Sequence, residues 1–72
     1  MDQRSSELTP RQYEVAGLIA EGRTNGEIAD QLGLVPGTVS EHTANILWCL
    51  GLRRRREITP RAIKQRQRPR GH

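Results

Sequence analysis

The most constraining feature of the sequence is the short connection, residues 33–35, between two predicted helices. The first helix is predicted over about residues 25–32 and the second over residues 36–50. Gly33 ends the first helix, because glycine adopts the left-handed conformation that closes helices, and Pro36 starts the second, because the first helical position needs no N–H donor. So short a connection with a glycine in it forces a sharp turn and matches the spacing of a helix-turn-helix.

Two capping sequences mark the starts of helices before this turn. Residues 9–12 (TPRQ) and 24–27 (TNGE) follow a pattern in which a threonine and the residue three positions later satisfy each other's backbone N–H groups. Leu8 and Tyr13 flank the cap at residues 9–12 as a hydrophobic staple, and Gly22 ends the helix that begins at this cap. Apolar residues recur with helical spacing at Val15, Ala16, Leu18, Ile19, Ala20, Ile28, Ala29 and Leu32.

Length and composition limit the chain to one small domain. With 72 residues, 33% of them hydrophobic, we expect an all-α, compact three- to four-helix bundle over residues 8–58 and a basic C-terminal segment over residues 59–72. A bundle of this size has little surface to enclose a substrate, and nothing positions a nucleophile beside acidic pairs such as Glu14 and Glu21. We therefore expect no enzyme activity, no cofactor and no small-molecule ligand.

Neither export nor membrane insertion is expected. No charged leader with a long apolar run opens the sequence, and no apolar stretch approaches the roughly 18 residues that a membrane span needs. The single cysteine, Cys49, has no partner for a disulfide within the chain. Cys49 and His42 are separated by about 10.5 Å along a helix axis, too far for one metal ion. We expect a cytoplasmic protein without a metal site.

Residues 51–72 admit two interpretations. In one, a fourth helix begins near Arg54 and kinks at Pro60. In the other, Thr59 caps a short helix that runs from Pro60 to about residue 66. Few apolar side chains are available to dock either helix. Residues 66–72 contain no large apolar residue, and we expect them to be disordered.

Basic residues gather in the second half of the chain. Residues 1–36 hold three arginines against six acidic residues, whereas residues 37–72 hold nine basic residues against two acidic ones. This asymmetry favours binding to a polyanion such as a nucleic acid, the alternative being a solvated tail that only confers solubility. The run Arg53, Arg54, Arg55 and Arg56 supplies candidate phosphate contacts.

The helix over residues 36–50 has a computable outer face. In a helix-turn-helix the second helix enters the major groove, and its first turns meet the base edges. At 100° per residue from Val39, the inner face takes in Thr43, Ile46 and Leu50 within about 40°, and His42 at about 60°. Ser40, Glu41 and Ala44 fall on the outer face. Ser40 can pair with several base edges, Glu41 can accept from cytosine N4, and Ala44 can contact the thymine methyl group.

Four further residues are candidates for phosphate contacts that set register. Thr24, Asn25 and Thr38 stand at predicted helix starts, where hydroxyls and backbone N–H groups bind phosphate. His42 is either a phosphate contact or a packed residue. The expected partner is double-stranded DNA.

From Leu8 to Ile58 the sequence resembles the LuxR-type, also called GerE-type, helix-turn-helix domain of bacterial transcriptional regulators. The resemblance is carried by residues 8–12 (LTPRQ), 18–22 (LIAEG), 24–25 with 27–29 (EIA), 38–39 with His42, 45–47 (NIL), 50–52 (LGL) and Arg55. It implies a four-helix bundle that binds DNA in transcription regulation, with Ser40, Glu41 and Ala44 facing the bases.

The sequence departs from this family at several positions. Val35 stands where many members have a serine N-cap, and Ser40, Gly26 and Cys49 stand where basic residues are usual. We hypothesise that the arginines of residues 53–70 replace the missing phosphate contacts. Pro60 falls inside the family's fourth helix, which is the dimer interface in many members.

A protein-interaction module with the same fold is the alternative function. Such a module would pair with another regulator and bind DNA only weakly and non-specifically, through its arginine-rich tail. Trp48 is predicted on the outer face of its helix, where it either lies against a neighbouring loop or contacts a protein. A second copy of the chain, or another regulator, would bind through Trp48 or the C-terminal helix. Binding to single strands or RNA is opposed by the scarcity of aromatic residues.

Overall fold

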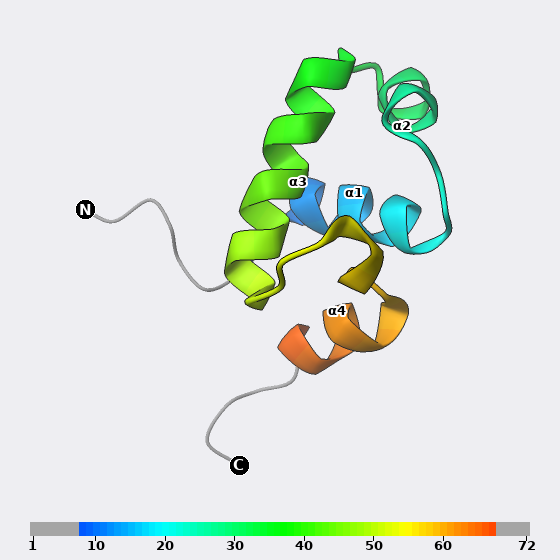
Figure 1. Cartoon of the computed structure of the whole chain (residues 1–72). Coiled ribbons are helices and arrows are strands. Elements are labelled where there is room, and N and C mark those ends of the chain that lie inside the picture. The colour runs from blue at the N-terminus through cyan, green and yellow to red at the C-terminus, as the bar shows by residue number, and fades with distance from the viewer. Residues whose placement is uncertain (1–7, 68–72) are drawn as a thin grey trace, which may run out of the picture.

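The computed structural model describes residues 8–67, and Figure 1 shows how their helices are arranged. The elements are α1 (Pro10–Ala20), α2 (Asn25–Leu32), α3 (Pro36–Leu50), the 3-10 turn η1 (Arg55–Glu57) and α4 (Pro60–Gln67). Helix α3 packs against α1 and α2, and α4 packs against α1 and α3. The all-α bundle predicted from the sequence is confirmed. No helix in this part of the chain is long and apolar enough to cross a membrane.

Both predicted capping boxes are present. At the start of α1, Thr9 Oγ1 accepts from the Gln12 N–H at 3.1 Å, and Gln12 Oε1 accepts from the Thr9 N–H at 3.0 Å. At the start of α2, Thr24 Oγ1 accepts from the Glu27 N–H at 3.1 Å, and Glu27 Oε1 accepts from the Thr24 N–H at 2.9 Å. Each box satisfies two backbone donors that a helix start leaves without partners, and this explains why both helices begin where predicted.

The turn between α2 and α3 depends on the backbone of Gly33. Its φ of 71° is left-handed, and the next N–H, from Leu34, donates to the carbonyl of Ala29 at 2.8 Å. No atom lies within 4 Å of a Cβ built at this glycine, so the requirement is one of conformation and not of space. After extended Val35, α3 begins at Pro36. The predicted helix-turn-helix connection is confirmed.

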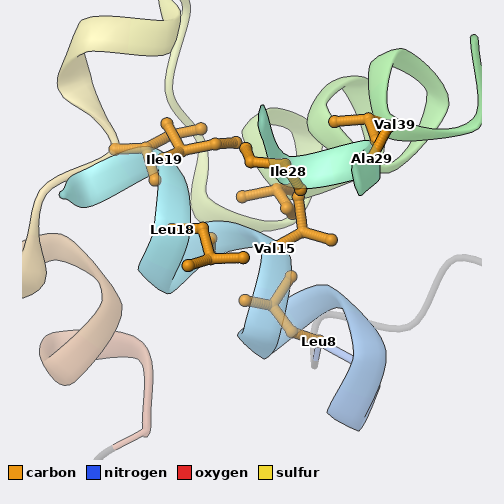
Figure 2. Packing of buried hydrophobic residues seen from close by; sticks show 10 residues of the cluster. Leu8, Val15, Leu18, Ile19, Ile28, Ala29 and Val39 are labelled. Carbon is orange, nitrogen blue, oxygen red and sulfur yellow. The ribbon is translucent and has the colours of Figure 1, made fainter. Parts of the chain in front are cut away.

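The core lies where α1, α2 and α3 meet. Figure 2 shows side chains of α1 directed toward α2 and α3. The predicted inner face of α3 is confirmed, because Val39, Thr43 and Ile46 are buried, and the Thr43 hydroxyl donates to the Val39 carbonyl at 2.8 Å. The buried hydrophobic residues are Leu8, Val15, Ala16, Leu18, Ile19, Ile28, Ala29, Val39, Ile46 and Ile58.

The segment after α3 follows the second of the two interpretations. Thr59 Oγ1 accepts from the Ala62 N–H at 3.1 Å, so Thr59 caps α4 and Pro60 is its first residue. A helix from Arg54 is wrong, since η1 occupies that stretch. The disorder expected from residue 66 onward is wrong for residues 66 and 67, which continue α4, because the helix that Thr59 starts does not stop at the last apolar side chain. Residues 68–72 lie outside the described part of the chain.

Val35 leaves the start of α3 without a side-chain cap, and this predicts a stabilising substitution. Its backbone is extended (φ −91°, ψ 152°), as an N-cap requires, and its side chain is 63% exposed. In Val35→Ser the hydroxyl accepts from the first turn of α3, and we expect the free energy of unfolding to rise by about 1 kcal/mol. Urea denaturation followed by circular dichroism measures the change. Val35→Ala, which has no hydroxyl, is the control. Equal stability of the two variants would contradict the claim that a hydroxyl at position 35 caps α3.

Candidate nucleic-acid interface

The outer face of α3 presents the residues that were predicted to read bases. Ser40, Glu41 and Ala44 are all exposed and lie between the second turn and the middle of the helix, away from the buried Val39. Their side chains are one short hydroxyl, one carboxylate and one methyl group. The structure therefore places the three candidates on one solvent-facing surface, which carries no basic side chain of its own.

The start of α2 lies against this surface. Asn25, the first residue of α2, is half-buried, and its Nδ2 donates to Ser40 Oγ at 3.0 Å. Thr24, which precedes it, is exposed, and its Oγ1 accepts from the Glu27 N–H in the capping box. Residues 24–25 and the first half of α3 thus form one continuous surface, as a helix-turn-helix needs if both helices are to approach the same groove.

Arg55 brings the arginine run to the same place. From η1, its Nη1 donates to Asn25 Oδ1 and its Nη2 donates to the carbonyl oxygen of Arg23 at 2.7 Å. These bonds span 30 and 32 residues of sequence. Figure 1 shows the segment after α3 turning back across the bundle toward α1. Arg53, Arg54 and Arg56 are exposed, whereas Arg55 is half-buried.

Glu57 closes the turn that carries these arginines. Its Oε1 accepts from the backbone N–H groups of Arg53, at 2.8 Å, and Arg54, at 3.3 Å. The hydrogen bond from Arg53, followed by the one from Arg54, lowers the pKa of the Glu57 carboxyl below its usual value. The carboxylate is therefore charged at neutral pH and holds residues 53–57 in a defined turn.

The remaining residues singled out from the sequence differ in how exposed they are. Thr38 and His42 are half-buried on α3, and the Thr38 N–H already donates to the Val35 carbonyl at 3.0 Å. Trp48 is 56% exposed, which agrees with its predicted place on the outer face, and Cys49 is half-buried against the core. Within residues 8–67, no group of three His, Cys, Asp or Glu side chains is placed to hold a metal ion.

The bond between Arg55 and Asn25 could not be foreseen from the sequence. Both residues were predicted as phosphate contacts, yet the structure directs their side chains to protein partners. No local spacing signals this, because residues 30 positions apart show no helical or turn periodicity. The only hint was that both residues belong to the stretches that carry the family resemblance.

The sequence is similar to known regulatory proteins. Residues 6–62 match the family described as bacterial regulatory proteins, luxR family. The chain is 40% identical over 52 residues to the transcriptional regulatory protein MctR of Rhizobium johnstonii, and the match covers 72% of this chain and 24% of MctR. It is 38% identical over 65 residues to the HTH-type transcriptional regulator MalT of Yersinia pestis and of Yersinia pseudotuberculosis, covering 90% of this chain and 7% of MalT.

The chain thus spans a quarter or less of the length of these relatives. The family match nevertheless takes in α1, α2, α3, η1 and the start of α4, the elements that build the helix-turn-helix and its supports. This chain belongs to the luxR family of bacterial regulatory proteins.

Proposed function

We propose that this domain binds double-stranded DNA sequence-specifically and thereby regulates transcription, with α3 in the major groove. The observation that carries the proposal is the continuous surface formed by the start of α2 and the outer face of α3, joined by the bond from Asn25 to Ser40. Membership of a family of regulatory proteins, with relatives named as transcriptional regulators, supports it. Major-groove entry by the second helix is the usual docking of this motif.

Base reading is assigned to Ser40, Glu41 and Ala44. All three are exposed, with Ser40 and Glu41 in the N-terminal half of α3, the part that meets base edges in this docking geometry, and Ala44 one turn further along the same face. Glu41 accepts a hydrogen bond from cytosine N4, and Ala44 contacts a thymine methyl group. Ser40 is small and uncharged, so its contribution depends on how its hydroxyl is directed.

Phosphate contacts are assigned to residues around this surface. Thr24 and Thr38 stand at the starts of α2 and α3, and His42 lies one turn further along α3. The exposed side chains of Arg53, Arg54 and Arg56 supply positive charge that the groove-facing helices lack. Asn25 and Arg55 serve a different purpose, since their side chains bond to each other.

The exposed Trp48 supports a second candidate function. At 56% exposure near the C-terminal end of α3, its indole offers an anchor for a protein partner. A second copy of the chain or another regulator would bind there or on α4. In this case the fold would serve protein pairing, and contact with DNA would be weak and non-specific.

A titration with DNA distinguishes the two functions. Isotope-labelled protein is titrated with a mixed-sequence duplex at about 150 mM salt, where exposed charges are screened beyond roughly 8 Å, and backbone amides are followed by NMR. We expect shifts concentrated in residues 24–27 and 36–45, because these contact the groove. Shifts confined to residues 53–65, with α3 silent, would contradict groove binding and favour the protein-interaction function.

The arginine run predicts a change in salt dependence. Replacing Arg53, Arg54 and Arg56 by glutamine removes charges but keeps the backbone N–H groups that Glu57 holds. We expect the slope of log K against log salt to flatten by about 0.9 for each phosphate that is no longer neutralised. The measurement is fluorescence anisotropy of a labelled duplex over a salt series. Arg11→Gln, on the remote start of α1, is the control and should leave the slope unchanged.

A lysine in place of Gly26 should have the opposite effect on the salt dependence of DNA binding. It is exposed in the first turn of α2, and a Cβ added there meets only Thr24 Oγ1 at 3.9 Å, an ordinary contact. In Gly26→Lys we expect tighter binding and a slope steeper by about 0.9, because one more phosphate is neutralised. Gly26→Ala shares the gain in helix propensity, about 1 kcal/mol, without the charge. If both variants bind DNA equally, the start of α2 does not face the phosphates.

A further inference from the structure

A directed chain of hydrogen bonds runs from η1 to the outer face of α3. Arg55 Nη1 donates to Asn25 Oδ1, and Asn25 Nδ2 donates to Ser40 Oγ at 3.0 Å. A second bond, from Arg55 Nη2 to the carbonyl oxygen of Arg23 at 2.7 Å, fixes the guanidinium plane. The chain therefore links three residues that stand at positions 55, 25 and 40 of the sequence and that belong to three different elements.

The chemistry of Arg55 sets the direction of this chain. A guanidinium group has only donors, so the atom of Asn25 that faces it must be the amide oxygen. The amide nitrogen then faces Ser40 and donates to the hydroxyl oxygen. A serine hydroxyl has one proton, and with one lone pair of its oxygen accepting from Asn25 that proton is directed away from Asn25, toward another acceptor. In the free protein, Ser40 is exposed and water can take this role.

Ser40 is exposed on the surface that we assign to the major groove. Resting on that proposed function, we propose that Arg55 and Asn25 act as positioning residues that make Ser40 a hydrogen-bond donor toward a base edge. Guanine O6 and N7, adenine N7 and thymine O4 are acceptors in the major groove, whereas cytosine presents the N4 amino donor. Ser40 thus favours a base that presents an acceptor, which is guanine, thymine or, through its N7, adenine, and it disfavours cytosine at the base it contacts.

Because the Ser40 side chain is short, the direction of its hydroxyl proton affects which base it can bind. A long basic side chain at this position reaches phosphate oxygens and carries little sequence information. A serine reaches only the nearest base edge, and it donates or accepts according to its neighbours. The exposed half of α3 has few other polar groups, so the polarity of this one hydroxyl is part of the sequence preference.

Asn25→Asp tests the direction of the chain. A carboxylate only accepts, so it keeps the bond from Arg55 but takes the proton of Ser40, whose lone pairs then face the DNA. We expect selection from a randomised duplex library, with the full 72-residue chain, to change the enriched base at one position. Guanine or thymine, which present only acceptors, should give way to cytosine, which presents the N4 donor, whereas adenine presents both an acceptor and a donor. The preference should reverse by about 2- to 10-fold, as expected for one neutral hydrogen bond.

The control for the added charge is the double variant Asn25→Asp with Ser40→Ala. It carries the same carboxylate without the hydroxyl, and it should show no preference for an amino donor at that position. Aspartate is favourable in the first turn of a helix, so α2 should remain folded, which circular dichroism verifies. Arg55→Leu is the second test. Without the guanidinium group, the Asn25 amide can present either its oxygen or its nitrogen to Ser40. The preference between guanine or thymine and cytosine should then fall toward equality.

The outcomes separate this proposal from the proposed function. A wild-type protein that selects its sites through α3, with an Asn25→Asp variant that keeps the same base preference, overturns the positioning role alone. A wild-type protein that enriches no sequence at all overturns both. Reversal in Asn25→Asp, abolished when Ser40 is also replaced, supports the chain from Arg55 to Ser40.

Discussion

The four largest of the fully buried side chains hold the three main helices in position. Val15 comes from α1, Ile28 from α2, and Val39 and Ile46 from α3. Burying an aliphatic side chain of this size contributes roughly 1.5–3 kcal/mol, and removing one leaves a cavity that its neighbours only partly fill. Because the core is small, the angle of α3 depends on each of them and on the sharp turn at Gly33. The inner face packs α3 against the core, and Trp48 is the large hydrophobic side chain that α3 exposes to solvent.

Polar contacts hold the segment after α3, which the small core anchors only weakly. The segment after α3 places one buried apolar side chain, Ile58, in the main core, and without polar contacts this segment would be held weakly. Arg55 ties η1 to residues 23 and 25, and Glu57 closes the turn from its other side. A planar guanidinium suits this role because its donors lie in a fixed fork that can engage two oxygens at once. The same turn then presents its other arginines to solvent, so its order and its charge come from neighbouring residues.

Most of the fold could be predicted from the sequence because its signals are local. Capping boxes, glycine stops and the apolar stripe of α3 lie within a few residues of the structure they specify, and the helix boundaries followed from them. The 3-10 turn was not predicted, because four consecutive arginines have no periodicity and because the turn is held by the distant acceptors of Arg55 as well as by Glu57. The exposure of Ser40, Glu41 and Ala44 followed from helical geometry alone. The contact that directs Ser40 did not, since it joins side chains from three elements.

The position of charge in the proposed complex has a consequence for selectivity. Positive charge lies mainly on the arginine turn, whereas the groove-facing half of α3 carries the carboxylate of Glu41 and no basic group. Near DNA, phosphates repel that carboxylate unless a base offers it a donor such as cytosine N4. At a site without such a donor, Glu41 loses its hydration and gains nothing in return. Arginines outside the groove supply attraction to any DNA, whereas Glu41 inside the groove imposes a penalty wherever its charge stays unpaired. Affinity and specificity therefore come from different residues, because wrong sequences are rejected by an unpaired charge.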